Sequence, residues 1–376
     1  MPVLAAILGC SLVALVLVDA FNTIMLARRA EHMFRIARIF YLVTWSPFAA
    51  IGRRMKSGRW REAFLSVYGP LSLLALFGFW ACGLITGFGL LQWALGMEPS
   101  ASRGTFANDL YLSAAALFTM TTGDPKNPAS RVIAVAEGGL GTGFLGLVVG
   151  YLPVLYQSFS KRELQISLMD ARAGSPPSAS ELLRSSPVRA ENLERQLEQW
   201  EMWAAQVLEN HLSFPMLAYF RSQHPNQSWL TTLICIADSA AVIRLCSRGD
   251  VRQQAELTFA MARHAISDIA AVFGAEEKAN AGERMSEGDF SEILGIISSQ
   301  PGLYEPSLLS WPELQRCRTL YEPEAFTLSE HLLMSLPLWV ADQASQEDWR
   351  ARGPNREDVP FTVSDPFHRS PGGTQK

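Results

Sequence analysis

The residues best suited to chemistry form one short run that could bind a dehydrated cation. The run carries hydroxyls, a glycine and a carboxylate, and it reads Thr119, Met120, Thr121, Thr122, Gly123 and Asp124. Its start overlaps an apolar stretch of about eleven residues, Leu110 to Met120, whereas a membrane span needs about 20. Backbone carbonyls at membrane depth can replace an ion's hydration shell where the loop is buried in protein or lines water. The run therefore predicts a re-entrant loop behind a short helix capped by Asn108 or Thr105. The alternative is an extracellular loop whose short helix packs on the bundle.

Three apolar segments are long enough to hold this loop in a bilayer of about 30 Å. They cover residues 3–26, 64–95 and 131–159. The segment from Arg28 to Glu62 carries nine basic and two acidic residues, which places it in the cytoplasm by the positive-inside rule. Within it, the apolar stretch Ile39 to Ile51 is too short to cross and predicts a segment lying at the interface. The sequence thus predicts a multi-pass protein of the cell (inner) membrane, with its N-terminus outside and everything after residue 160 in the cytoplasm.

Around this loop the sequence resembles the potassium-channel family, and within it the prokaryotic members with two pore-forming helices around a single pore loop. The resemblance covers residues 64–160, so the first apolar segment is an addition. Against the family's T-V-G-Y-G-D filter, the matching residues are Thr119, Gly123 and Asp124, and the substituted ones are Met120, Thr121 and Thr122. Thr121 stands at the first glycine, and a β-branched residue is disfavoured at the positive φ that glycine adopts readily. The filter therefore either has another shape here or is strained, and potassium selectivity does not carry over.

The resemblance implies a cation pore built from four copies of the chain, because a single loop cannot surround an ion. It gives Asp124 a place at the outer mouth, where four carboxylates would concentrate cations; a plain turn beside Pro125 is the alternative. Membrane lipid and a homotetramer are the expected partners. No catalytic residue, no cofactor and no metal beyond a permeating monovalent cation are expected.

The third apolar segment is rich in glycine, which predicts bending or close packing. Gly143, Gly146 and Gly150, followed by Pro153, are candidates for a gating hinge, because the inner helix of the resembled channels bends near such a glycine. Small residues four apart, such as Gly139 and Gly143, also permit close helix packing. Packing alone is therefore the alternative.

Two carboxylates lie within or close to the membrane, where ionisable groups are costly and by default functional. Glu137 lies about two turns into the third segment and is predicted to bond to the back of the pore loop and support the filter. The alternative is an interfacial carboxylate that faces water. Asp19 is expected to pair with an arginine or with the polar side of another helix.

The remainder of the chain predicts a linker, a helical domain and a tail. Gly, Pro and Ser are frequent from Ala171 to Ala190, which predicts a linker. Apolar residues at spacings of three and four predict helices at about 190–212, 228–247, 251–274, 288–298 and 327–349. The six histidines and five cysteines show no metal-binding or nucleophile spacing, so we do not expect an enzyme.

Charge divides the chain into a slightly basic part and an acidic part. Residues 1–158 hold 12 Lys/Arg and 7 Asp/Glu, and the remainder hold 20 and 29. Nucleic acid is not an expected partner, because the second part lacks the basic footprint that phosphate binding needs. A cytoplasmic small-molecule or protein regulator is expected instead. The polar segment Phe220 to Trp229 is one candidate contact, and a simple turn between helices is the alternative.

These observations predict an all-α membrane protein, with three transmembrane helices and a re-entrant pore helix followed by an all-α cytoplasmic domain. The predicted units are an N-terminal helix with a basic interfacial segment (1–63), a pore domain (64–160), a linker (161–190), a helical regulatory domain (191–350) and a disordered tail (351–376). The predicted function is a tetrameric cation channel gated by the inner helix and the helical domain. The alternative is a non-conducting, membrane-anchored signalling or scaffold protein with a degenerate pore loop.

Overall fold

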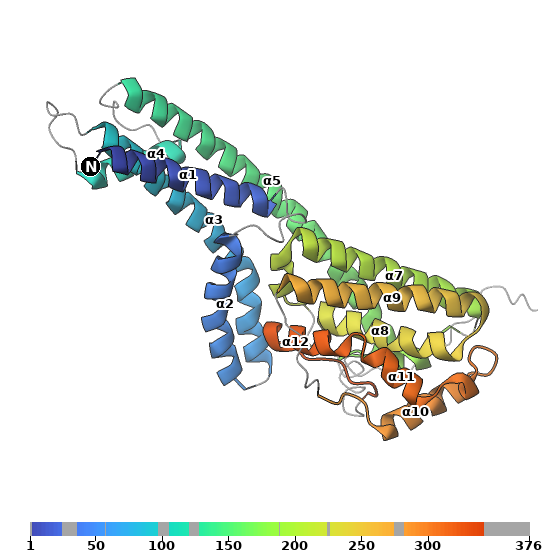
Figure 1. The fold of residues 1–376 in the computed structure, drawn as a ribbon. Helices are drawn as coiled ribbons and strands as arrows, with labels where there is room; N and C mark the ends of the chain where they lie inside the picture. Colours follow the sequence, from blue (N-terminus) through green and yellow to red (C-terminus); the bar gives the residue numbers. More distant parts are fainter. Residues whose placement is uncertain are drawn as a thin grey trace, which may run out of the picture.

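The regular structure of the described chain is helical. The structure, a computed structural model, describes residues 2–24, 36–56, 58–96, 105–119, 128–187, 189–223, 226–273 and 282–341. Across these residues the regular elements are α-helices and short 3-10 helices, without a strand, which confirms the all-α prediction. Figure 1 shows a narrow arm that contains α1, α3, α4 and the start of α5, and a globular domain that contains α7 to α12. The predicted tail, 351–376, lies outside the described residues.

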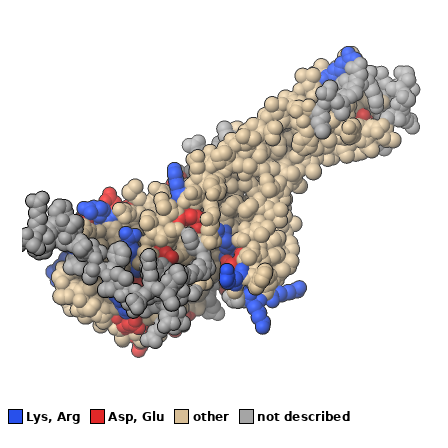
Figure 2. Space-filling view, turned by 180° about the vertical axis from the view of Figure 1, so that it is seen from behind, with Lys and Arg blue, Asp and Glu red and all other residues tan. Residues whose placement is uncertain are grey.

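The arm has the surface of a membrane-spanning bundle. Its helices are α1 (Pro2–Ile24), α3 (Arg59–Leu95), α4 (Phe106–Leu117) and the first part of α5 (Pro128–Ala173). Of these, α1, α3 and α5 are long and apolar enough to cross a membrane. Between its two ends the arm shows uncharged residues on the face seen in Figure 2. Large apolar side chains stand exposed there, such as Leu74 at 59% and Val135 at 76%. This surface is compatible with a multi-pass membrane protein.

A fourth helix, α8 (Trp229–Cys246), also has the length and composition of a span, but it lies in the globular domain. Of the 18 residues in this apolar helix, 89% are buried inside the protein. The long amphipathic helices α7 (Ala190–Ser213) and α9 (Gly249–Val272) pack against it and against each other. A helix that is apolar on all sides is the expected centre of a helical domain. The burial of α8 therefore accounts for its hydropathy.

The first helix packs along α3 through glycine. Glycines on both helices meet, since a Cβ at Gly9 would lie 2.7 Å from the carbonyl oxygen of Gly87. A Cβ at Gly83 would lie equally close to a methyl of Val16. Gly83 and Gly87 are four residues apart, the spacing that lets two helices approach closely. The sequence left the role of the first helix open, and the structure places it against α3.

Asp19 of α1 is 4% exposed, and its partners lie on two other helices. One carboxylate oxygen accepts the backbone N–H of Ile36 at 2.9 Å, at the start of α2 (Ile36–Arg54). The other accepts the indole N–H of Trp80 of α3, also at 2.9 Å. A carboxylate at a helix N-terminus satisfies free N–H groups and is stabilised by the helix dipole. Asp19 therefore joins α1, α2 and α3. Its polar partners are the start of α2 and the indole of Trp80.

The segment predicted as a linker, 161–190, is largely helical and partly buried. Helix α5 continues without a break to Ala173, and α6 (Ala179–Arg184) follows. Leu182 and Leu183 of α6 are fully buried in the domain core. The Gly, Pro and Ser residues mark the tight connection around α6 instead of a long spacer. As a result, the arm and the domain share one continuous helix.

The last predicted helix, 327–349, is placed too late in the chain. The structure has α12 (Glu322–Leu332), which ends where Leu333 adopts a left-handed conformation with φ 55. The described residues after it, up to Ala341, are not helical. Pro337 in any case prevents a helix from running on to 349, because proline lacks the N–H that a helix needs and restricts the residue before it. The remaining elements of the domain are α10 (Glu287–Ser298), α11 (Trp311–Arg318) and the 3-10 helices η1 (Pro215–Tyr219) and η2 (Pro306–Leu308).

Candidate functional site

The short helix α4 runs inward between α3 and α5. Its first turn lies near the end of α3, where the rings of Trp93 and Phe106 are 5.9 Å apart. Its last turn lies against α5, where a Cβ at Gly141 would come within 1.9 Å of the carbonyl oxygen of Leu117. Gly141 is thirteen residues after Pro128, which is about 20 Å along α5. The C-terminal end of α4 is therefore held well inside the arm, with the outer ends of α3 and α5 beyond it.

Glu137 lies directly behind α4 and is fully buried. Its Oε1 accepts a hydrogen bond from the hydroxyl of Ser113 on α4, and this hydroxyl also lies 2.8 Å from the carbonyl oxygen of Ile85 on α3. Its other oxygen, Oε2, has no hydrogen-bond partner among the described residues. The hydroxyl of Ser113 thus joins α3, α4 and α5. The alternative of a Glu137 that faces water does not fit this burial.

A second polar pair closes the outer end of the arm. Gln92 of α3 is 3% exposed and donates its amide N–H to the carbonyl oxygen of Ser130 at 3.3 Å. The hydroxyl of Ser130 donates to the amide oxygen of Gln92. Two hydrogen bonds in opposite directions fix α3 and α5 relative to each other, because buried polar groups are costly unless paired. Sequence reasoning missed this pair, although a glutamine inside an apolar span was a signal for it.

Of the predicted filter residues, the structure describes Thr119. Its N–H donates to the carbonyl oxygen of Ala116 at 3.1 Å, and its φ is 56, in the left-handed region that is unusual for a β-branched residue. The chain therefore leaves the helical path at the residue where the predicted filter begins. Met120, Thr121, Thr122, Gly123 and Asp124 lie outside the described residues.

The predicted hinge residues lie on an open face of α5. A Cβ at Gly143, Gly146 or Gly150 would find no atom within 4 Å, and the same holds for Gly139. Close packing within the described chain therefore does not explain these glycines. Pro153 lies inside the continuous helix α5. Large apolar side chains share the open surface of α5, including Leu145 at 64% exposed and Val149 at 63%.

Two neighbouring charged residues near the end of α5 join the arm to the domain through their hydrogen bonds. Arg162 is 2% exposed and donates to the carbonyl oxygens of Leu217 at 2.9 Å and Phe220 at 2.8 Å. The carboxylate of Glu163 lies 3.1 Å from the Arg162 guanidinium and accepts the Ser222 hydroxyl at 2.6 Å. Because both charges are buried and bonded to η1 and the segment after it, this part of the domain is tied to α5.

A cluster of aromatic rings completes this junction. Tyr219 of η1 lies within 4.9 Å of Trp45 on α2 and 5.2 Å of Tyr68 on α3, measured between ring centroids. Trp45 donates its indole N–H to the carbonyl oxygen of His331, at the end of α12, at 2.9 Å. In this way α2 and the first turns of α3 contact the domain directly. The part of the polar segment 220–229 nearest the arm also serves the junction, through Ser222 and the carbonyl of Phe220.

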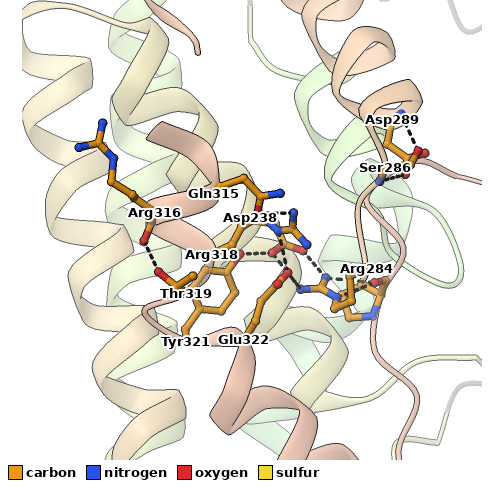
Figure 3. A network of polar contacts seen from close by, with 11 residues as sticks. Asp238, Arg284, Ser286, Asp289, Gln315, Arg316, Arg318, Thr319, Tyr321 and Glu322 are labelled. Carbon is orange, nitrogen blue, oxygen red and sulfur yellow. Dashed lines mark hydrogen bonds and ion pairs between the residues drawn. The ribbon is translucent and has the colours of Figure 1, made fainter. Parts of the chain in front are cut away.

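The domain core holds a buried charge network that sequence reasoning missed (Figure 3). Asp238 of α8 is fully buried and lies 2.6 Å from Arg284, and it also accepts the Tyr321 hydroxyl. Arg284 lies 3.0 Å from Glu322, which Arg318 contacts at 3.1 Å. Burial is the largest influence on Glu322 and raises the pKa of its carboxyl. Every charge has an opposite partner, and Arg284 also donates to the carbonyl oxygen of Pro337 at 3.0 Å, so the network fixes α8, α11 and α12.

Comparison with protein-family models, with curated proteins and with solved structures finds no match for this chain. In the part of the chain that the structure describes, three or more His, Cys, Asp or Glu side chains do not gather into a metal-binding group. The arrangement of α3, α4 and α5 is therefore the feature of the molecule that bears on its function.

Proposed function

We propose that this protein is a homotetrameric cation channel of the inner membrane, with its helical domain in the cytoplasm. Residues Thr119 to Asp124 form the filter, and α5 lines and gates the pore. The observation that carries the proposal is the position of α4. A twelve-residue helix is too short to cross a bilayer, yet its C-terminal end lies about 20 Å along α5, against Gly141.

The C-terminal end of α4 favours a cation nearby. The carbonyl groups at the end of a helix carry a partial negative charge, which is worth more in surroundings of low dielectric constant than in water. In a tetramer, four such ends point toward one axis and stabilise an ion there. The bonds among Ser113, Glu137 and Ile85 hold α4 in this orientation.

The open face of α5 supports assembly around a pore. The glycines on it have no neighbours in the described chain, and large apolar side chains beside them are exposed. A second copy packed on this face would bury the apolar side chains, while the glycines would allow close approach. A bend at Gly143, Gly146 or Gly150 would widen the inner end of the pore.

The junction gives the helical domain a way to act on the gate. Arg162 and Glu163 on α5 are bonded to η1 and the following residues, so a movement of the domain is transmitted to α5. Because α5 is one continuous helix from Pro128 to Ala173, this movement reaches the glycines of the span.

The test is ion flux in liposomes that contain the purified full-length protein. Flux of potassium, sodium and a large organic cation is compared, with Thr121→Gly measured in parallel. We expect flux of the small cations and exclusion of the large one, with a higher potassium preference in Thr121→Gly. Absence of flux in the native protein, with flux restored by Thr121→Gly, would favour the non-conducting scaffold. Absence of flux in both proteins would refute the channel.

A further inference from the structure

A helical hairpin beside the domain begins near the inner end of the first span. It consists of α2 and residues 59–74 of α3, and its two helices meet where the rings of Phe48 and Phe64 lie 4.5 Å apart. We call it the α2–α3 hairpin. Its first residue, Ile36, is bonded to Asp19, which lies five residues before the end of α1, or about 8 Å along that helix. The hairpin therefore starts close to the level at which α1 ends.

The side of the α2–α3 hairpin that faces away from the domain is exposed and uncharged. On the inner side, Trp45 and Tyr68 contact Tyr219 of the domain. Residues 39–52 of α2 and 63–74 of α3 carry no charge. The large apolar residues exposed on the outer side are Ile39, Leu42, Val43 and Ile51 of α2 and Val67, Leu71 and Leu74 of α3. A helix pair surrounded by water would carry charged or polar residues on this side.

This uncharged side continues into the exposed apolar surface of the arm. Helix α3 is one helix from Arg59 to Leu95, and large apolar residues are exposed from its first part to Phe79 in the span. Figure 1 shows the hairpin at an angle to the arm, and Pro70 inside α3 is a sufficient cause for a bend. An apolar surface that leaves the arm at an angle can lie along the membrane, with its side chains in the interface.

The free end of the α2–α3 hairpin is strongly basic. Of the ten residues 53–62, five are basic, namely Arg53, Arg54, Lys56, Arg59 and Arg61, and the first four are exposed. The acid of this stretch, Glu62, lies 3.4 Å from Arg221 of the domain. Trp60 is 85% exposed among these cations. Figure 2 shows Lys and Arg side chains gathered at this end of the hairpin. Basic clusters beside a span attract anionic lipids, and tryptophan prefers the membrane interface.

We propose that the α2–α3 hairpin lies on the cytoplasmic surface of the membrane and binds anionic phospholipids there. Its outer side contacts the acyl chains just below the headgroups, and the cations of its free end contact the phosphates. Because its inner side contacts Tyr219, the bound hairpin holds the domain beside the membrane. The proposal rests on the proposed topology and not on conduction, since a non-conducting scaffold would have the same hairpin.

The first measurement locates the outer side of the hairpin with a fluorescent label. The exposed native cysteines, Cys10 and Cys82, are replaced by alanine, and Val43→Cys is introduced for labelling, because Val43 is 65% exposed. The full-length protein is placed in vesicles of phosphatidylcholine and phosphatidylglycerol. Quenching by a lipid that carries a nitroxide near its headgroup is compared with quenching by iodide in the water.

The matched control for this label is Leu257→Cys in the same background. Leu257 is 48% exposed on α9 and lies sixteen residues, about 24 Å, before Phe273, whose ring contacts Tyr219 at the junction. We expect the lipid quencher to act on the label at Val43 and iodide to act on the label at Leu257. Equal iodide quenching at the two positions would place the hairpin in water and overturn the proposal. Protection of the Val43 label from both quenchers would show a protein cover, such as a second copy, and would also overturn it.

The second measurement tests the basic end with a label at Ala63→Cys, an exposed position near the start of α3. Three cations at the end of the hairpin are replaced together by glutamine, namely Arg53, Arg54 and Lys56. The matched control removes the same net charge from the domain surface by glutamine at Arg248, Arg252 and Arg316, which are exposed.

The removal of three cations from the hairpin should weaken its contact with anionic lipid about 100-fold, because each cation near such a surface contributes about fivefold. We therefore expect the lipid quencher to lose its effect on the Ala63 label in this variant, and also in vesicles of phosphatidylcholine alone. The domain variant should retain the quenching of the native protein. Equal quenching in the two triple variants would overturn the proposal.

Discussion

Replacement of Gly141 by alanine should move the end of α4. The added Cβ would lie 1.9 Å from the carbonyl oxygen of Leu117, whereas real Cβ contacts are essentially never shorter than 3.0 Å. Because this oxygen belongs to the backbone, the end of α4 must move by at least about 1.1 Å, the difference between these distances. We expect this movement to displace the start of the predicted filter at Thr119, two residues further along the chain.

Gly78→Ala in α3 is the matched control, since a Cβ at Gly78 would find no atom within 4 Å among the described residues and Gly78 has no part in the proposed pore. Both changes gain the same helix propensity, about 0.5–1 kcal/mol. Overpacking at Gly141 costs about 1–3 kcal/mol. Gly141→Ala should therefore be less stable than Gly78→Ala by about 1–3 kcal/mol.

Two measurements on the same preparations check this prediction. Thermal unfolding of the full-length protein in detergent compares stability, and liposome flux compares conduction. We expect Gly141→Ala to unfold at a lower temperature than Gly78→Ala and to lose most of the small-cation flux that Gly78→Ala retains. Equal unfolding temperatures and equal flux in the two variants would refute the placement of α4 against α5.

Three further predictions concern buried polar groups. Glu137→Ala leaves Ser113 without its carboxylate partner and should reduce flux strongly. Glu137→Gln should retain most of the flux, because its amide can still bond to Ser113. Equal flux in both variants would contradict the role of Glu137 in holding α4. Burial, and after it the charge of Arg162, lowers the pKa of His211 from its usual 6.5 to about 3. The unfolded chain therefore binds a proton that the folded protein does not, and the free energy of unfolding falls as the pH drops below about 6.5, by about 2 kcal/mol at pH 5. Denaturant unfolding at pH 7.5 and pH 5 should show this loss, and His211→Phe should remove it; an unchanged pH dependence in the variant would refute the assignment. Asp238→Asn should cost about 3–5 kcal/mol in the same unfolding assay, because it leaves Arg284 without its closest counter-charge, and a loss below about 1 kcal/mol would contradict the importance of the network.

Hydropathy and helical spacing predicted most of the helices because these patterns reflect burial and lipid contact. The shortness of the apolar stretch before Met120 was enough to predict α4 as a separate helix. Its position against Gly141 was not predictable, because it depends on the packing of three helices. A break within 327–349 was predictable, since Pro337 lies inside the stretch that was expected to be helical.

The candidate site was only partly visible in the sequence. Glu137 stood out as a carboxylate in an apolar segment, but its partner Ser113 is an ordinary residue of a short helix. Asp238 carried the same signal within α8, yet Arg284 is 46 residues away along the chain, and no local pattern joins them. Long-range pairs of this kind are decided by tertiary packing, which a single sequence does not encode in any periodic form.

The most direct test of the pore is chemical modification of a cysteine in the predicted filter mouth. Cys10 and Cys82 are the exposed native cysteines and are replaced by alanine, whereas Cys235 and Cys246 are buried, and burial raises the pKa of the Cys246 thiol to about 12. Cys317 is also buried and is retained. Asp124→Cys is then introduced, and liposome flux is measured before and after addition of a membrane-impermeant, positively charged thiol reagent. We expect modification to stop cation flux in Asp124→Cys and to leave the background protein unchanged. Complete modification of Asp124→Cys with undiminished flux would contradict it.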